Sequence, residues 1–226
     1  MKSVSVLGDS ISTFSGWNPE GYAVYYTEPV QALNGLQSAA DTWWAIVLDK
    51  LNAELCVNNS YSGSWVSGSL FPSGVSDERL KNLRDERVPD IILIYLGMND
   101  YANGVPSLHN SSSGVRDTVY YFEDAYDVML EKIRKYYPDT TVVCSTLLRP
   151  FLKRDETQHF PEEYRGVLFE DYNTAIRTAA GRHGCLLADN GSFNERYETL
   201  DGLHPTSAGH RTLARLWIRS LMDLGI

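Results

Sequence analysis

Short apolar runs alternate with longer amphipathic stretches along the chain. The runs are continuous rather than alternating with polar residues, which is typical of parallel strands that are covered on both faces. We therefore expect strands at residues 4–7, 55–57, 91–96, 141–144 and 186–188.

Between these runs, apolar residues recur at helical spacing. Three stripes, at residues 122–136, 169–183 and 213–221, predict amphipathic helices, and we expect further helices at 42–51 and near 77–84. Strand–helix alternation predicts an α/β fold with a parallel sheet and right-handed crossovers. The chain has no internal repeat and no low-complexity linker, so we interpret residues 1–226 as a single domain.

Three connections are unusually long: residues 11–41, 98–120 and 146–166. Each follows a predicted strand, which places each at the carboxyl edge of the sheet. Ligands bind at this edge in open α/β sheets, and long connections in a compact domain are more often functional than idle. The pattern therefore predicts the position of a binding site before any motif is considered.

Composition and charge narrow the classes of partner. Hydrophobic residues make up 43% of the 226 residues and charged residues 22%, as in an ordinary soluble protein. The net charge of −9 argues against nucleic acid and against anionic membrane surfaces, which favours a neutral small molecule. No apolar segment approaches the ~20 residues that span a bilayer, and the first residues lack the pattern of a secretory signal. We expect a cytoplasmic protein.

The first motif is Gly8-Asp9-Ser10, which directly follows the first predicted strand. A serine on a turn at the carboxyl end of a strand is held where a substrate can reach it. The same tripeptide is equally typical of a helix N-cap, because Asp and Ser both cap well.

The last motif places Asp201 and His204 three residues apart, directly before the C-terminal helix. A serine hydroxyl is a poor nucleophile until a base takes its proton, and that base needs a group that fixes its tautomer. This spacing can supply both groups from one turn. The alternative is a turn in which Asp201 bonds to nearby backbone and His204 is incidental.

Two glycine- and asparagine-containing turns follow the second and third predicted strands, and they include Gly63 and Asn99. Acyl transfer to a serine develops negative charge on the carbonyl oxygen, which needs preorganised donors. The Gly63 N–H and the Asn99 amide are candidates. The alternative for each is an ordinary turn, for which glycine and asparagine are expected.

Taken together and in this order, the four motifs resemble the blocks of the GDSL/SGNH hydrolase superfamily. The resemblance implies a three-layer α/β/α fold with a central parallel sheet of about five strands in the flavodoxin-like order 2-1-3-4-5. It implies Ser10 as nucleophile, His204 as general base and then acid, and Asp201 as the orienting carboxylate. The implied oxyanion donors are the Ser10 N–H, the Gly63 N–H and the Asn99 side chain. It implies no metal and no organic cofactor.

The matching motifs run from Gly8 to Pro205 and bracket nearly the whole chain. One departure is Ile11, where the first block of the family ends in leucine, and this is an apolar-for-apolar exchange. The Gly-x-Ser-x-Gly elbow of the α/β-hydrolases is absent, so that larger family is not the match.

Aromatic residues cluster near these motifs. Trp17 and Trp65 are candidate substrate contacts, and Tyr22, Tyr25 and Tyr26 are candidate linings of an acyl or alcohol pocket. Such residues suit a carbohydrate platform or an apolar acyl slot. The alternative is that they pack the long connection onto the body of the protein.

Other polar residues are weaker candidates. His109 and His159 fall in two of the long connections, where solvent exposure is the simpler interpretation. His183 belongs to a helical stripe, and His210 is expected to be structural. Arg149 follows the fourth predicted strand and could meet an anionic substrate group.

The sequence thus predicts a serine esterase that releases a short acyl group, such as an acetyl group on a carbohydrate. One alternative is an acyltransferase, which would use the same acyl-enzyme. Another is a catalytically silent ligand-binding module, which would be expected to lack at least one motif residue. The sequence leaves the oligomeric state open.

Overall fold

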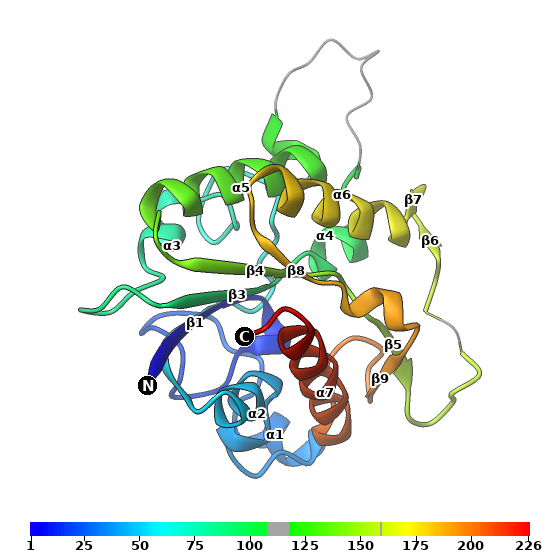
Figure 1. The fold of residues 1–226 in the computed structure, drawn as a ribbon. Coiled ribbons are helices and arrows are strands. Elements are labelled where there is room, and N and C mark those ends of the chain that lie inside the picture. Colours follow the sequence, from blue (N-terminus) through cyan, green and yellow to red (C-terminus); the bar gives the residue numbers. More distant parts are fainter. Residues whose placement is uncertain (108–117, 159) are drawn as a thin grey trace.

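A five-stranded parallel sheet forms the centre of the computed structural model, which describes residues 1–107, 118–158 and 160–226 (Figure 1). Its strand order is β2-β1-β3-β4-β8, and every neighbouring pair is parallel. This is the 2-1-3-4-5 order that the resemblance implies. The strands are β1 (Lys2–Gly8), β2 (Ala53–Ser60), β3 (Ile91–Tyr95), β4 (Thr141–Ser145) and β8 (Leu186–Ala188).

Helices cover both faces of the sheet and complete three layers (Figure 1). On one face α2 (Trp43–Lys50) packs against α7 (Ser207–Asp223). On the other, α5 (Phe122–Tyr136) packs against α3 (Asp77–Lys81) and α6 (Phe169–Arg182). The expected helices are confirmed, although α3 ends at Lys81 rather than near Arg84, where the interpretation of the sequence placed its end.

The core explains why the central strands are continuous apolar runs. All five residues of β3 are buried, and its neighbour β1 is buried from Ser3 onward. Between the sheet and the solvent, Trp43 of α2 stacks on Trp217 of α7, with ring centroids 5.2 Å apart. β2 differs, because its first five residues are only half-buried. It lies at the edge of the sheet, where one side of the strand has no neighbouring strand.

The three long connections contain short elements that the sequence did not predict. The first contains η1 (Ser10–Ser12), α1 (Glu28–Asn34) and η2 (Ala39–Asp41), and the second contains α4 (Met98–Asn103) and η4 (Thr118–Tyr120). The third contributes β5 (Arg149–Leu152), which pairs in parallel with β9 (Arg196–Thr199), and β6 (Glu163–Tyr164), which pairs with β7 (Val167–Leu168). A further turn of 3-10 helix, η5, spans Asn190–Phe193.

The carboxyl ends of the strands lead directly into the four motifs. Ser10 follows β1, Gly63 follows β2 and Asn99 follows β3, while Asp201 and His204 lie between β9 and α7. In the part of the chain that the structure describes, no helix has both the length and the apolar character needed to cross a bilayer.

Candidate active site

The turn that carries Ser10 is held by side chains of the turn itself. Asp9 is the N-cap of η1, and its Oδ1 accepts the Ile11 N–H at 3.0 Å. The Thr13 hydroxyl donates to the Ser10 carbonyl at 2.9 Å. The capping interpretation of this motif is therefore correct for Asp9, and it leaves the Ser10 hydroxyl free to face another element. Ser10 is only 3% exposed.

Asp201, His204 and Ser10 form a continuous hydrogen-bonded chain. His204 Nε2 lies 2.9 Å from Ser10 Oγ, across 194 residues of sequence, and His204 Nδ1 lies 2.7 Å from Asp201 Oδ2. The other oxygen, Asp201 Oδ1, accepts the backbone N–H groups of Leu203 at 2.9 Å and His204 at 2.8 Å. Both interpretations of this motif are therefore correct. Oδ1 of Asp201 bonds to the backbone of the turn, and Oδ2 bonds to the His204 ring.

The charge of Asp201 determines the imidazole tautomer. Burial by itself would raise the pKa of the Asp201 carboxyl, but the hydrogen bonds from the His204 side chain and backbone outweigh it and hold the pKa well below its ordinary value. The carboxylate therefore only accepts, and Nδ1 of a neutral His204 carries the proton. This leaves the Nε2 lone pair directed at the Ser10 hydroxyl, the arrangement that a general base requires.

Gly63 and Asn99 lie on the two neighbouring turns. Gly63 is exposed and has φ +78°, a left-handed conformation that glycine adopts without a steric penalty. An Asn99 Nδ2–H donates to the Ser64 carbonyl at 2.9 Å, which fixes the amide and leaves its second N–H for a ligand. Among the described residues, the N–H groups of Ser10 and Gly63 have no protein acceptor.

Asp100 fastens the turn after β2, a role that the sequence analysis missed. Its fully buried carboxylate accepts the N–H groups of Val66 at 2.8 Å and Ser67 at 2.9 Å. Burial raises its pKa to about 6, against the lowering effect of these bonds. Asn99 and Asp100 are adjacent in sequence, and together they bond to the backbone of Ser64–Ser67, the segment that directly follows Gly63.

Arg79 is a second residue that the sequence did not single out. Its side chain is fully buried and donates to the carbonyls of Gly8, Asn59 (3.0 Å) and Pro72 (2.8 Å), and to Asn59 Oδ1 (3.1 Å). Burial lowers its pKa to about 10, so the guanidinium stays charged at neutral pH. It joins the ends of β1 and β2 to the loop that follows Gly63.

Two buried titratable groups, Asp9 and His210, interact with His204. Burial raises the pKa of Asp9 to about 6 and lowers the pKa of His210 to about 3. His210 Nδ1 accepts the Trp43 N–H at 3.2 Å, so this histidine is a neutral core acceptor, as expected for a structural role.

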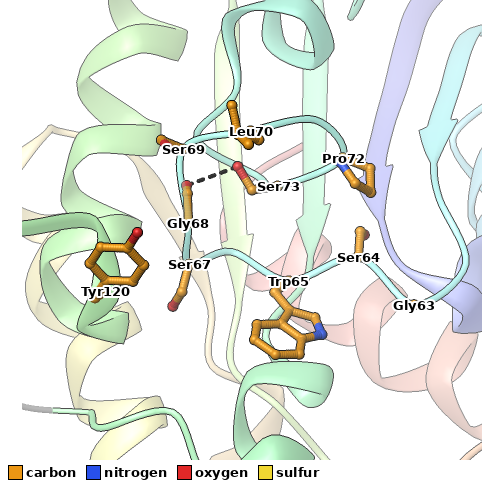
Figure 2. Close-up of a pocket in the computed structure, with 10 residues that line it drawn as sticks. All are labelled: Gly63, Ser64, Trp65, Ser67, Gly68, Ser69, Leu70, Pro72, Ser73 and Tyr120. Carbon is orange, nitrogen blue, oxygen red and sulfur yellow. Dashed lines mark hydrogen bonds between the residues drawn. The ribbon is translucent and has the colours of Figure 1, made fainter.

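A pocket of about 330 Å³ begins at Gly63. Figure 2 shows the residues that line it. The rings of Trp65 and Tyr120 lie on the same side of the loop that forms it (Figure 2). Trp65 is 39% exposed, as a ligand contact would be. The lining consists of aromatic, hydroxyl-bearing and small residues with few aliphatic ones: Gly63, Ser64, Trp65, Ser67, Gly68, Ser69, Leu70, Pro72, Ser73 and Tyr120.

Trp17 does not line the pocket beside Gly63. It packs on Trp44, with ring centroids 5.7 Å apart, and lines a groove of about 540 Å³ between α2 and the edge strand β2. Ser10, Asp201 and His204 line neither this groove nor the pocket beside Gly63, but the pocket includes the candidate oxyanion donor Gly63 and the groove does not.

The tyrosines of the first long connection have separate environments. Tyr22 packs edge-on against Phe71 and tilted against Tyr61, which fastens the connection to the loop after β2. Tyr26 is fully buried and donates to the Pro205 carbonyl at 2.7 Å. Packing is therefore the correct interpretation for these two, whereas Tyr25 contacts the site itself.

The remaining polar candidates form other contacts. His183 Nε2 lies 2.9 Å from Asp127 Oδ1, and Arg149 pairs with Glu162 at 3.0 Å. His109 and His159 lie outside the described residues. Within residues 1–107, 118–158 and 160–226, no three His, Cys, Asp or Glu side chains are grouped so that they could hold a metal ion.

Comparison with known proteins identifies a family whose model matches this chain. The model of the GDSL-like lipase/acylhydrolase family matches residues 2–160, which include Ser10, Gly63 and Asn99 but end before Asp201. No curated protein sequence matches the chain.

Solved structures match nearly the whole chain. A Bacteroides ovatus protein assigned as a GDSL-like lipase has a TM-score of 0.74 at 24% identity, over 99% of both chains. A Bacteroides uniformis protein with the same assignment has a TM-score of 0.72 at 23% identity, over 99% of this chain and 96% of that one. A variant of an acetyl-xylooligosaccharide esterase from Geobacillus stearmophilus has a TM-score of 0.64 at 18% identity, over 97% of this chain and 94% of that one. At these identities the likeness shows the fold.

Proposed function

Because this chain belongs to the GDSL-like lipase/acylhydrolase family, we propose that it is a serine esterase that cleaves a carboxylic ester through an acyl-enzyme on Ser10. The observation that carries the proposal is the hydrogen-bonded chain from Asp201 through His204 to Ser10, with distances of 2.7 and 2.9 Å. A general base in contact with both a hydroxyl and an orienting carboxylate is the arrangement that activates serine.

The reaction proceeds in two halves. His204 Nε2 takes the Ser10 proton while Oγ attacks the ester carbonyl, and the resulting oxyanion is met by the N–H groups of Ser10, Gly63 and Asn99. The tetrahedral intermediate collapses when His204 returns that proton to the departing alcohol. Water then attacks the acyl-enzyme with its proton passing to His204, and the acid leaves as Ser10 regains a proton.

The substrate that we propose carries a short acyl group, such as acetyl, on a carbohydrate. The pocket beside Gly63 supports this choice, since two exposed aromatic rings offer a stacking surface and the exposed Ser69 offers a partner for a sugar hydroxyl. Among the described residues that line it, the aliphatic ones are Leu70 and Pro72, which gives a long acyl chain little to pack against. The likeness to an acetyl-xylooligosaccharide esterase is compatible with this proposal at the level of the fold.

Two alternatives use the same geometry. An acyltransferase would pass the acyl group to an alcohol instead of water, and adding an acceptor alcohol to the assay would reveal the new ester. A silent binding module would not need the contact between His204 and Ser10, and that contact is formed here at 2.9 Å.

We expect Trp65→Ala to lower kcat/KM for an acetylated xylooligosaccharide by roughly tenfold, because it removes the exposed ring that a sugar would stack on. The rate on p-nitrophenyl acetate should fall by less than about twofold, since that ester has no sugar to bind. Wild-type kcat/KM for p-nitrophenyl acetate should exceed that for the octanoate by roughly tenfold or more. Steady-state kinetics on the three esters measure all of these ratios.

Trp17→Ala is the matched control, because Trp17 is a similarly exposed tryptophan (48%) that lines a different groove. It should leave the ratio between the sugar ester and the aryl ester unchanged. Equal losses on both esters in the Trp65 variant, or faster octanoate than acetate hydrolysis, would contradict the assignment of substrate class.

A further inference from the structure

Tyr25 contacts both members of the pair that would activate Ser10. Its ring is stacked on the His204 imidazole, with centroids 3.4 Å apart and planes 12° apart. Its hydroxyl donates to Asp201 Oδ2 at 2.9 Å, the same oxygen that accepts from His204 Nδ1. One side chain thus covers the face of the base and bonds to its orienting carboxylate.

The backbone of Tyr25 is tied to the nucleophile turn. Its N–H donates to the Thr13 hydroxyl at 2.9 Å, and that hydroxyl donates in turn to the Ser10 carbonyl at 2.9 Å. The segment that presents the Tyr25 ring is therefore connected to the turn that presents Ser10. A shift of either one would be transmitted to the other through Thr13.

We propose that Tyr25 is a positioning residue that fixes the plane of the His204 imidazole with its ring and the Asp201 carboxylate with its hydroxyl. This inference rests on the proposed esterase function. The four motifs assign this residue no role, because it lies in the long connection between the motif of Ser10 and that of Gly63. Tyr25 acts through His204 and Asp201, the two side chains that it contacts.

The hydroxyl also modulates the base. Burial first, and then the bond to Asp201, raise the pKa of Tyr25 above its ordinary value, so its hydroxyl stays protonated and remains a donor at neutral pH. Donation to Asp201 disperses the carboxylate charge that holds a proton on His204. Without the hydroxyl, the Asp201 carboxylate stabilises a proton on His204 more strongly, so the variant should have a higher His204 pKa than the wild type.

The other polar groups around His204 and Tyr25 are the same in the wild type and in the variants of Tyr25. Asp9 and His210 interact electrostatically with His204, Asn34 bonds to the Tyr25 side chain, and Tyr26 packs edge-on against its ring. His210 stays neutral, because burial keeps its pKa near 3. Asp9 titrates in the same range as a histidine, but it does so in both proteins, so a difference between them isolates the hydroxyl of Tyr25.

The test compares Tyr25→Phe, which keeps the ring, with Tyr25→Leu, which removes it. We expect Tyr25→Phe to lower kcat about three- to tenfold with little change in KM, and to move the acidic limb of kcat/KM upward by about half a pH unit. Tyr25→Leu should lower kcat further, because the imidazole then also loses the ring that is stacked on its face. An NMR titration of the His204 Cε1 proton should show the same upward shift for Tyr25→Phe without any substrate.

Tyr136→Phe is the matched control, because it removes a tyrosine hydroxyl that contacts another aspartate, Asp77, on the outer face of α5. If Tyr25→Phe behaves as Tyr136→Phe does in kcat and in the His204 titration, the proposal is overturned. An enzyme inactive on every ester would refute the proposed function, while the NMR titration would still decide the positioning role. Tyr25→Phe replaces only a half-buried hydroxyl, so the test does not depend on whether Tyr25→Leu folds.

Discussion

Ser10→Ala is expected to lower kcat for ester hydrolysis by roughly 10⁵–10⁶-fold, the loss typical of removing a serine nucleophile whose partners act as a unit. The alanine has no oxygen to form the acyl-enzyme, and His204 then has no hydroxyl to deprotonate. What remains is the background rate from binding and the oxyanion donors. Burst and steady-state assays with p-nitrophenyl acetate measure the loss.

The variant loses the bond between the Ser10 hydroxyl and His204. It should keep its fold, because the turn is held by Asp9 and Thr13 instead. Ser15→Ala, an exposed serine on the same connection, is the control and should retain wild-type rates. A folded Ser10→Ala protein that retains more than about a tenth of wild-type kcat would remove Ser10 from the role of nucleophile.

Asn99→Ala is expected to lower kcat by roughly 10²–10³-fold with little change in KM, since an oxyanion donor acts mainly in the transition state. The free N–H of the Asn99 amide is the one that would meet the charge, while the other is bonded to Ser64. Steady-state kinetics on p-nitrophenyl acetate separate the two constants.

Asn103→Ala is the companion variant, because its amide, on the same helix α4, donates to the Asn99 carbonyl at 2.8 Å. It perturbs the helix near Asn99 without removing the candidate donor, so its kcat should stay within a few-fold of wild type. If the Asn99 loss is below tenfold, or is equally large in Asn103→Ala, the amide is not an oxyanion donor and acts only by holding its helix.

The fold could be predicted because its strongest signals are local. The continuous apolar runs of β1, β3, β4 and β8 and the helical spacing of apolar residues in α5, α6 and α7 are both visible in the local sequence. The shorter elements carry no such signal. β5 and β9 have four residues each and exist by pairing with one another across more than 40 residues of sequence. Register of that kind is set by tertiary contacts, which local patterns do not encode.

The site was predictable to the extent that it consists of short motifs at strand ends. Ser10, His204 and Asp201 are brought together as their spacing and order suggest. Tyr25 lies 176 residues from Asp201, and nothing in its local sequence distinguishes it from Tyr22 or Tyr26. Asp100 and Arg79 act likewise through contacts that only the folded chain creates, and their buried charges show no sequence signature.

The most direct test of this account is covalent labelling with a fluorophosphonate, which reacts with an activated serine and displaces fluoride. Peptide mass spectrometry of the labelled wild type should locate a single adduct on Ser10, and the Ser10→Ala protein should remain unlabelled. An adduct on a different serine, or no adduct on an enzyme that hydrolyses p-nitrophenyl acetate, would contradict the claim that Ser10, activated by His204 and Asp201, carries the reaction.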